Sequence, residues 1–84
     1  DMYYYGHGVE KNLALSVSWY EKAAEKNNTY GQYRLAMCYK NGYGVEQDYE
    51  LAFYWYEKAA NQDYPSAQSQ LGDMYYYGHG VEKA

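Results

Sequence analysis

The 84-residue sequence predicts an all-α solenoid, a stack of antiparallel helix pairs with about two and a third repeats. The first observation is internal repetition: a shift of 36 residues superposes 48 residue pairs without a gap, and 19 of them are identical. The second is that apolar residues within each unit recur at helical spacing. The third is a glycine directly after the first helical stretch of each unit, where a left-handed C-terminal cap favours it.

The repeat is clearest in two blocks. Residues 6–10 match residues 42–46 and 78–82, and residues 19–24 match residues 55–60. A fixed period of 20 to 50 residues is the sequence signature of a repeat architecture, in which each unit is one supersecondary element. We therefore interpret each unit as two helices joined by the Gly-x-Gly-Val loop.

The first helix of a unit is expected at about residues 30–41 and again at about residues 66–77. Its apolar positions recur at spacings of four, four and three, which places them on one side of a helix that packs against its neighbours. In the second copy this predicted buried stripe consists of Ala67, Leu71, Tyr75 and Gly78.

The helix ends carry recognisable signals. Gly42 and Gly78 follow the first helices as expected left-handed caps, and Pro65 stands in a first turn, where its missing N–H has no cost. Asn12 and Asp48 occupy equivalent positions before the second helices, and both residue types accept a hydrogen bond from an otherwise unpaired backbone N–H. We predict both as N-caps.

The second helix is expected to pack through an aromatic residue and small residues. Trp19 and Trp55 are equivalent, and we expect both to fill the space between layers, while the alanines that follow allow a neighbouring helix to approach closely. The predicted contact positions of the second copy are Leu51, Trp55, Ala59 and Ala60. Residues 27–29 and 63–65 are predicted turns.

This register predicts one repeat domain, residues 1–84. Residues 1–11 form the C-terminal end of a first helix with its loop, residues 12–47 form one unit, and residues 48–83 form the next, truncated at residue 84. We therefore expect a piece of a longer array that is cut inside a repeat at both ends.

The repeat pattern closely resembles that of the Sel-one-like repeat family, relatives of the tetratricopeptide repeat. The motif is Leu71-Gly72-x-x-Tyr75-x-x-Gly78-x-Gly80-Val81, continued by Asp48-x-x-x-Ala52-x-x-Trp55-Tyr56-x-x-Ala59-Ala60. The resemblance covers the whole chain, and the period of 36 and the loop distinguish it from the tetratricopeptide period of 34. Gly31 and Ala36 depart from the pattern only by exchanging one small residue for another.

The resemblance implies a right-handed superhelix whose first helices line an inner, concave surface. It also implies an adaptor that holds protein or peptide partners. Opposite the buried stripe, the first helices carry side chains that differ between the two copies, and the tyrosine triplets at 3–5 and 75–77 place some rings outside the stripe. The predicted partner-binding residues are Tyr5, Tyr30, Arg34, Met37, Asn41, Gln70, Asp73, Tyr76 and Tyr77.

Charge and composition exclude several other classes. The net charge is −4, of mixed sign along the chain and without a Lys/Arg cluster, which argues against nucleic acid and anionic membranes as partners. No apolar run approaches the roughly 20 residues of a membrane span. A single cysteine excludes an intramolecular disulfide. It is compatible with a reducing compartment such as the cytoplasm, and the localisation stays open.

The candidate catalytic and metal-binding side chains each have at least one repeat equivalent that lacks their chemistry. His7 and His79 are equivalent to Tyr43, and neither has a further zinc-ligand residue near it in sequence. Cys38 is equivalent to Met2 and Met74, so the position favours a soft apolar side chain in a core. The Gly-x-Gly loop follows a helix and lacks the third glycine of a dinucleotide site. We predict no catalytic, cofactor or metal site, and no enzyme.

Two functions stay open at this point. The first is a protein-interaction scaffold that binds a partner on the concave face. The alternative is a self-assembling or engineered repeat protein that associates end to end, because residues 1–11 are identical to residues 73–83. Identical terminal segments without polar capping helices permit exchange of end helices or head-to-tail stacking.

Overall fold

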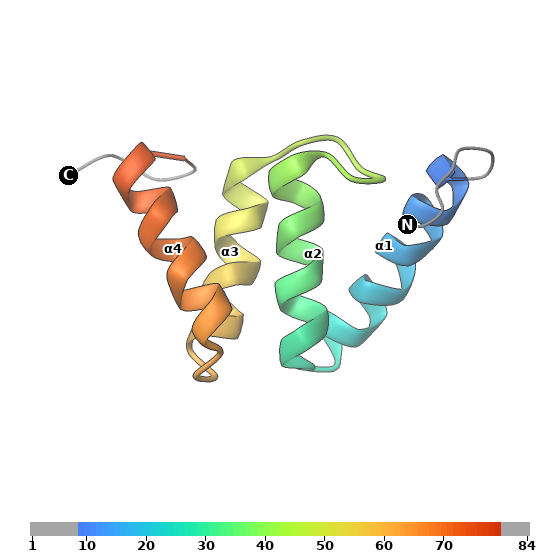
Figure 1. Ribbon diagram of the computed structural model, residues 1–84. Coiled ribbons are helices and arrows are strands. Elements are labelled where there is room, and N and C mark those ends of the chain that lie inside the picture. The colour runs from blue at the N-terminus through green and yellow to red at the C-terminus, as the bar shows by residue number, and fades with distance from the viewer. Residues whose placement is uncertain (1–8, 80–84) are drawn as a thin grey trace.

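The computed structural model describes residues 9–79, with side chains from Leu13 onward, and it consists of four helices (Figure 1). They are α1 (Val9–Glu25), α2 (Thr29–Asn41), α3 (Tyr49–Ala60) and α4 (Pro65–Tyr77), and no strand occurs among them. Helix α2 packs against α1 and α3, and α3 also packs against α4. The all-α repeat fold is confirmed, and the two predicted first helices are α2 and α4.

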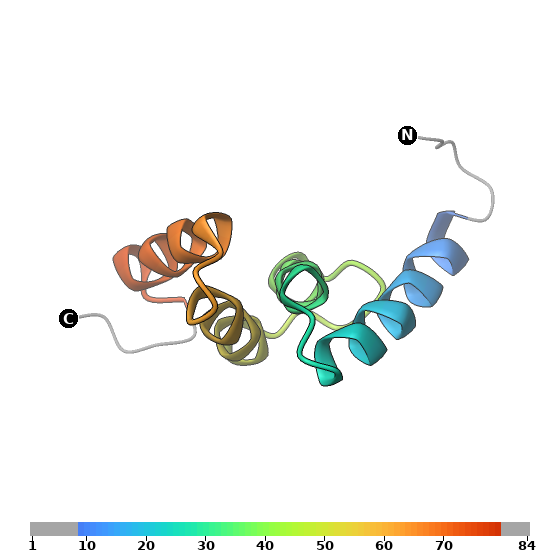
Figure 2. The same ribbon diagram turned by 90° about the horizontal axis from the view of Figure 1, so that it is seen from below.

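The helices form two layers. When the molecule is viewed along α2 and α3, α2 and α4 lie on one side and α3 lies on the other (Figure 2). Helix α1 runs obliquely on the side of α2 that is away from α4. The two first helices therefore share a layer, as the repeat predicts. Tyr5 and the rest of the predicted helical segment before residue 9 lie outside the described residues.

The predicted caps of the central helices are confirmed. Gly42 and Gly78 adopt left-handed conformations with φ of 73° and 75°, and their N–H groups donate to the carbonyls of Cys38 and Met74. The Asp48 carboxylate accepts a hydrogen bond from the backbone N–H of Leu51. Each cap thus satisfies a backbone group that the helix leaves unpaired at its end.

The prediction that Asn12 is an N-cap is wrong, because α1 begins at Val9. The equivalent loop before α3 is held out of helical conformation by the end of α2. The Asp48 N–H donates to the Tyr39 carbonyl at 2.8 Å, and the Gln47 side chain donates to the Lys40 carbonyl at 2.8 Å. The residue equivalent to Tyr39 is Tyr3, which lies outside the described residues, so the described part of the chain provides no such anchor before α1.

Buried side chains form two clusters, one on each side of α2. The first joins α2, α3 and α4 around the fully buried Tyr56 and Met74. The second joins α1 and α2 around Val17 and Leu35 and includes Cys38, which is buried as predicted. Trp55 contacts both clusters and so joins them.

Three positions predicted to be inside the stack are exposed. Trp19 is 62% exposed, Tyr75 is 52% exposed and Leu51 is 39% exposed. Trp19 and Tyr75 belong to the two end helices, and the Tyr75 ring is covered only in part, by its edge-to-face contact with Phe53 of α3 at 5.5 Å. Leu51 lies in the first turn of α3, and the neighbouring Ala52 takes the buried place instead.

A buried glutamine, which the sequence analysis missed, connects the turns of the two units. Gln32 is fully buried, and its amide nitrogen donates to the Ala24 carbonyl at 3.4 Å and to the Asn27 side chain at 3.2 Å. Its amide oxygen accepts from the Gln62 side chain at 2.8 Å. The equivalent Gln68 donates to the Ala60 carbonyl, so this contact between successive helices recurs with the repeat.

Gly31 explains the first departure from the family pattern. A Cβ atom at this position would lie 2.7 Å from the Cβ of Ala23 and 3.1 Å from the backbone nitrogen of Ala24. Helices α1 and α2 therefore cross too closely for the alanine that the pattern favours, whereas the equivalent Ala67 is fully buried between α3 and α4.

Candidate protein-binding face

The predicted partner-binding residues within the described range lie on the two first helices. Tyr30, Arg34, Met37 and Asn41 project from α2, and Gln70, Asp73, Tyr76 and Tyr77 project from α4. None of these side chains is buried, and Tyr30, Tyr76 and Tyr77 are each more than half exposed. We call the surface formed by these eight residues the α2/α4 face.

One part of this face surrounds Arg34. Its guanidinium lies 5.8 Å from the centre of the Tyr30 ring and 5.6 Å from the centre of the Tyr20 ring, both within cation–π range. The Nε group donates to the Tyr20 hydroxyl at 3.3 Å, and Nη1 lies 3.9 Å from the Met37 sulfur. Two helices thus hold one cation between two aromatic rings.

The charge of Arg34 is stable. The hydrogen bond to the Tyr20 hydroxyl raises the pKa of Arg34 above its ordinary value, and this outweighs the opposing effect of partial burial. No carboxylate forms an ion pair with Arg34 within residues 13–79, and its five N–H donors exceed the two contacts described. The guanidinium therefore keeps donors free for a ligand group.

Tyr20 is a site residue that the sequence analysis missed. It belongs to α1, a second helix, and its repeat equivalent Tyr56 is fully buried, with its ring centre 5.8 Å from that of Tyr33 in a tilted arrangement. The hydroxyl of Tyr56 has no hydrogen-bond partner in the described part of the chain, and burial raises its pKa. The identical residues offer no sign of this difference, which depends on how α1 crosses α2.

The α4 side of the face is organised differently. Gln70, the equivalent of Arg34, accepts a hydrogen bond from Lys40 at 2.7 Å and so joins the two first helices directly. Asn41 donates to the Met37 carbonyl within its own helix, and Asp73 is exposed to solvent. The predicted residues therefore form two groups on one layer rather than a single cluster.

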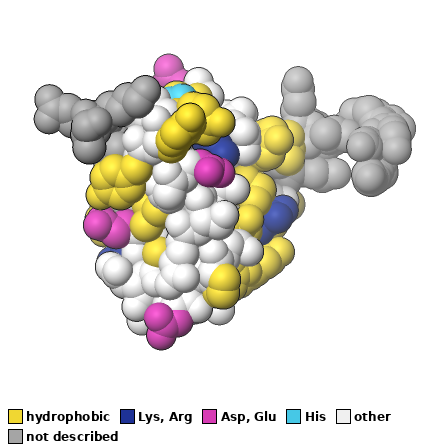
Figure 3. All heavy atoms as spheres, turned by 60° about the vertical axis from the view of Figure 1, so that its left-hand side comes forward, with side chains coloured by type: hydrophobic (Ala, Val, Ile, Leu, Met, Phe, Trp, Pro, Cys, Tyr) yellow, Lys and Arg dark blue, Asp and Glu magenta, His cyan; other side chains and the backbone are white. Residues whose placement is uncertain are grey.

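The second group is aromatic and lies at the C-terminal end of α4. Tyr77 packs edge-on against Tyr76 with ring centres 4.9 Å apart, and it stacks on His79 at 5.7 Å. His79 also stacks on Tyr49 of α3 at 4.3 Å with nearly parallel rings. Figure 3 shows the histidine beside hydrophobic side chains at this end of the molecule. His79 thus acts here as a packing residue between aromatic rings.

Cys38 lies in the core cluster beneath the α2/α4 face. Burial raises the pKa of its thiol, and the nearby Arg34 charge opposes this only in part. We expect alkylation by iodoacetamide at pH 8 to be at least about tenfold slower in the folded protein than in the urea-unfolded chain. Equal rates would contradict the buried position. A Cys38→Ala variant that also carries Ser18→Cys, at an exposed site on α1, should react rapidly.

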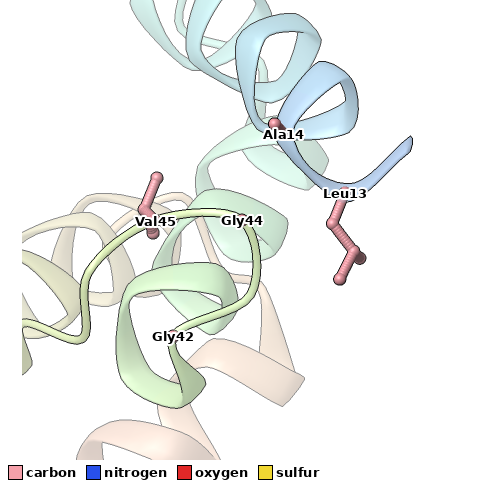
Figure 4. A pocket seen from close by; sticks show the side chains of 5 residues that line it. All are labelled: Leu13, Ala14, Gly42, Gly44 and Val45. Carbon is pink, nitrogen blue, oxygen red and sulfur yellow. The ribbon is translucent and has the colours of Figure 1, made fainter. Parts of the chain in front are cut away.

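The loop between α2 and α3 forms one side of an open depression of about 490 Å³ (Figure 4). Its lining consists of Leu13, Ala14, Gly42, Gly44 and Val45, all apolar or without a side chain. Such a lining offers no acid, base or nucleophile.

Within the described residues, no group of three His, Cys, Asp or Glu side chains is placed to hold a metal ion. None of the four helices has the length and apolarity needed to cross a bilayer.

Comparison with known proteins agrees with this architecture. The sequence model of the Sel1 repeat matches residues 1–28, 29–64 and 65–83, and two of these segments begin at the first residues of α2 and α4. The chain is similar to c5321, a protective antigen of uropathogenic Escherichia coli strains that displays an SLR fold. The identity is 44% and the TM-score 0.83, over 86% of this chain and 15% of that chain.

A second solved structure, the Sel1 repeat protein from Oxalobacter formigenes, is 32% identical with a TM-score of 0.81. The similarity covers 84% of this chain and 29% of that chain, so this chain spans less than a third of either protein. The repeat matches extend over almost the entire sequence, and the helix pairs superpose on those of both proteins. The chain therefore belongs to the Sel1 repeat family.

Proposed function

We propose that this chain is a protein-interaction module that binds a protein or peptide segment on the α2/α4 face. Sel1 repeat proteins are in general scaffolds for protein interactions and belong to a non-enzymatic family. The observation that supports the proposal is the arrangement of Arg34 between the rings of Tyr20 and Tyr30. Arginine and tyrosine are enriched among the residues that contribute most to binding energy at protein interfaces.

The chemistry of the face suits an extended segment. Arg34 supplies a fixed planar cation with free donors, and its two aromatic neighbours hold it without a competing carboxylate. Such pre-organisation reduces the side-chain entropy that binding would otherwise cost. The aromatic group around Tyr77 offers apolar contact area on the neighbouring first helix. A segment that lies across both first helices contacts the two groups together.

The proposal can be tested with peptides selected by display against the immobilised protein. We expect Arg34→Ala to weaken their binding about tenfold or more by isothermal titration calorimetry, because a central, partly desolvated anchor is lost. Arg34→Lys should also weaken binding, because lysine lacks the planar donor geometry. Tyr77→Ala should weaken binding of the peptides that reach α4.

Glu57→Ala is the matched control. Glu57 is exposed on α3, in the other layer, so its replacement should leave the affinity unchanged. Circular dichroism spectra of all variants should show the helical content of the parent. Unchanged affinity in both Arg34→Ala and Tyr77→Ala would exclude the α2/α4 face as the binding surface.

A second function, association of copies end to end, is favoured by a separate observation. Helix α1 exposes Leu15 and Trp19 and α4 exposes Tyr75, although Trp55 and Tyr39, the repeat equivalents of Trp19 and Tyr75, are largely covered. The ends of a helical solenoid expose apolar surface when no capping repeat covers them. Association of copies removes this surface from water.

A further inference from the structure

We propose that the segment bound on the α2/α4 face presents a carboxylate, which binds the edge of the Arg34 guanidinium formed by Nη1 and Nη2. The Tyr20 hydroxyl donates a further hydrogen bond to the same group. This inference rests on the first function proposed above and names the chemistry of its partner. It concerns an acidic protein or peptide segment, whose carboxylate belongs to an Asp or Glu side chain or to a chain terminus.

Helix α2 is basic although the protein as a whole is acidic. Its 13 residues include Arg34 and Lys40 and no Asp or Glu, whereas the net charge of the chain is −4. Helices α1 and α3 carry acidic residues beside their basic ones, and α4 carries Asp73 and no basic residue. The positive charge of this layer is therefore concentrated on α2. Two cations suit an acidic peptide segment better than the long anionic backbone of a nucleic acid.

Arg34 has an edge that its neighbours leave available. Nε donates to the Tyr20 hydroxyl at 3.3 Å, whereas the contact of Nη1 is with the Met37 sulfur at 3.9 Å. Sulfur is a weak acceptor, so this contact does not satisfy the terminal nitrogens. The edge formed by Nη1 and Nη2 keeps the two parallel N–H groups that bind a carboxylate through both of its oxygens.

The Tyr20 hydroxyl adds a donor beside the guanidinium. Its oxygen accepts the hydrogen bond from Nε, and this is the hydrogen bond that the hydroxyl makes among residues 13–79. A hydroxyl that accepts still has its own O–H proton to donate. A neutral carbonyl could accept these hydrogen bonds, but a carboxylate also neutralises the charge of Arg34, and charge-assisted hydrogen bonds are the stronger ones.

The aromatic rings hold the guanidinium without neutralising it. The ring centres of Tyr20 and Tyr30 lie 5.6 and 5.8 Å from the guanidinium carbon. Among residues 13–79, the groups that raise the pKa of Arg34 are these two tyrosines and Cys38, and none of them is a carboxylate. Because the cation is already positioned and partly desolvated, less freedom and less water are lost when a carboxylate binds.

Lys40 extends the basic surface of α2 towards α4. It follows Arg34 by six residues, which is about 9 Å along a helix axis. Its ammonium group donates to the uncharged side chain of Gln70 at 2.7 Å. About three residues of an extended segment span the same distance. A second acidic residue three positions from the first therefore reaches Lys40, whereas Asp73 repels acidic residues placed over α4.

Peptide display on the immobilised parent protein and on Arg34→Gln, carried out side by side, tests the inference. We expect Asp or Glu at a fixed position in the peptides selected on the parent and no such preference on Arg34→Gln, which lacks the charge. In the tightest peptide, replacement of that residue by Asn or Gln should weaken binding about tenfold in isothermal titration calorimetry. C-terminal amidation identifies the source, because it weakens binding only when the terminal carboxylate is the bound group.

A double-mutant cycle separates direct contact from a general effect of charge. The acidic peptide and its neutral form should bind Arg34→Gln with nearly equal affinity. Tyr20→Phe keeps the ring and removes the hydroxyl, so it should reduce the preference for the acidic peptide about threefold or more. Lys58→Gln is the matched control: Lys58 lies 5.3 Å from the Tyr54 ring centre on α3, in the other layer, and its replacement should leave the preference unchanged.

The failure of this inference differs from the failure of the proposed function. Peptides that depend on Arg34 but bind equally well after their carboxylates are neutralised overturn the inference and leave the α2/α4 face standing. A preference for acidic peptides that survives in Arg34→Gln, or disappears in Lys58→Gln, overturns it as well. Unchanged affinity in both Arg34→Ala and Tyr77→Ala, or selection of no peptide at all, contradicts the proposed function itself and the inference with it.

Discussion

Replacement of Trp55 by alanine should lower the free energy of unfolding by about 3 kcal/mol, near the lower end of the range for buried aromatic residues. Trp55 packs against both core clusters, and its ring centre lies 5.0 Å from that of Tyr54. Its removal opens space at the junction of α1, α2 and α3. Urea denaturation monitored by circular dichroism measures the change.

Trp19→Ala is the matched control for this prediction. Trp19 occupies the same repeat position, yet it is 62% exposed, and the Lys22 ammonium group lies 5.1 Å from its ring centre. We expect its replacement at low protein concentration to change the stability by no more than about 0.5 kcal/mol. Equal losses in the two variants would show that Trp19 is buried in solution and would contradict the described arrangement of α1.

Gly44→Ala should destabilise the protein by about 2–4 kcal/mol, because two costs combine at this position. Gly44 has a φ of 73°, which other residues adopt only with strain. A Cβ atom there would also lie 2.7 Å from the carbonyl oxygen and 2.8 Å from the carbonyl carbon of Leu13. These are backbone atoms of α1, so relief would require the loop or the helix to move.

Gly72→Ala provides the opposite result for the same substitution. Gly72 lies within α4 with nothing within 4 Å of a Cβ atom, so alanine should stabilise the helix by about 0.5–1 kcal/mol. The two variants differ only in backbone conformation and in the approach of a neighbour. Thermal unfolding at low concentration measures both, and a loss of stability in Gly72→Ala would contradict the open surroundings described for α4.

The surroundings of Gly44 also show what the Gly-x-Gly loop does. The sequence analysis set aside a phosphate-binding role for this loop and interpreted it as the connection between helices. The geometry supplies a physical reason for the glycine, since the loop backbone rests directly on α1. The repeated motif is therefore a packing contact between units as well as a turn.

Local signals predicted the helices and their caps well. Gly42, Gly78 and Asp48 act within a few residues of their own position; α2 and α4 follow the expected ranges closely, and α3 begins after the predicted cap Asp48. Such signals need no information about distant neighbours. This is why the helix bounds could be predicted from one sequence without an alignment.

Burial at the two ends of the stack could not be predicted in this way. The repeat assigns Trp19 the environment of Trp55 and Tyr75 the environment of Tyr39, but equivalent positions share an environment only where helices pack on both sides. The same applies to the binding face. Arg34 was identified from its place opposite the buried stripe, whereas its partner Tyr20 depends on the crossing of α1 and α2. Gln32 was missed because a polar residue in a core is stabilised by partners that no periodicity indicates.

Packing between helices that follow one another along the chain has a kinetic consequence. Because α1 packs on α2, α2 on α3 and α3 on α4, the main helix contacts join segments separated by one short connection. Closing short loops carries a small entropic cost, and proteins dominated by local contacts fold quickly. A helix pair anywhere along such a chain can begin folding while the rest is still unstructured, and the adjacent helices then add to it in sequence.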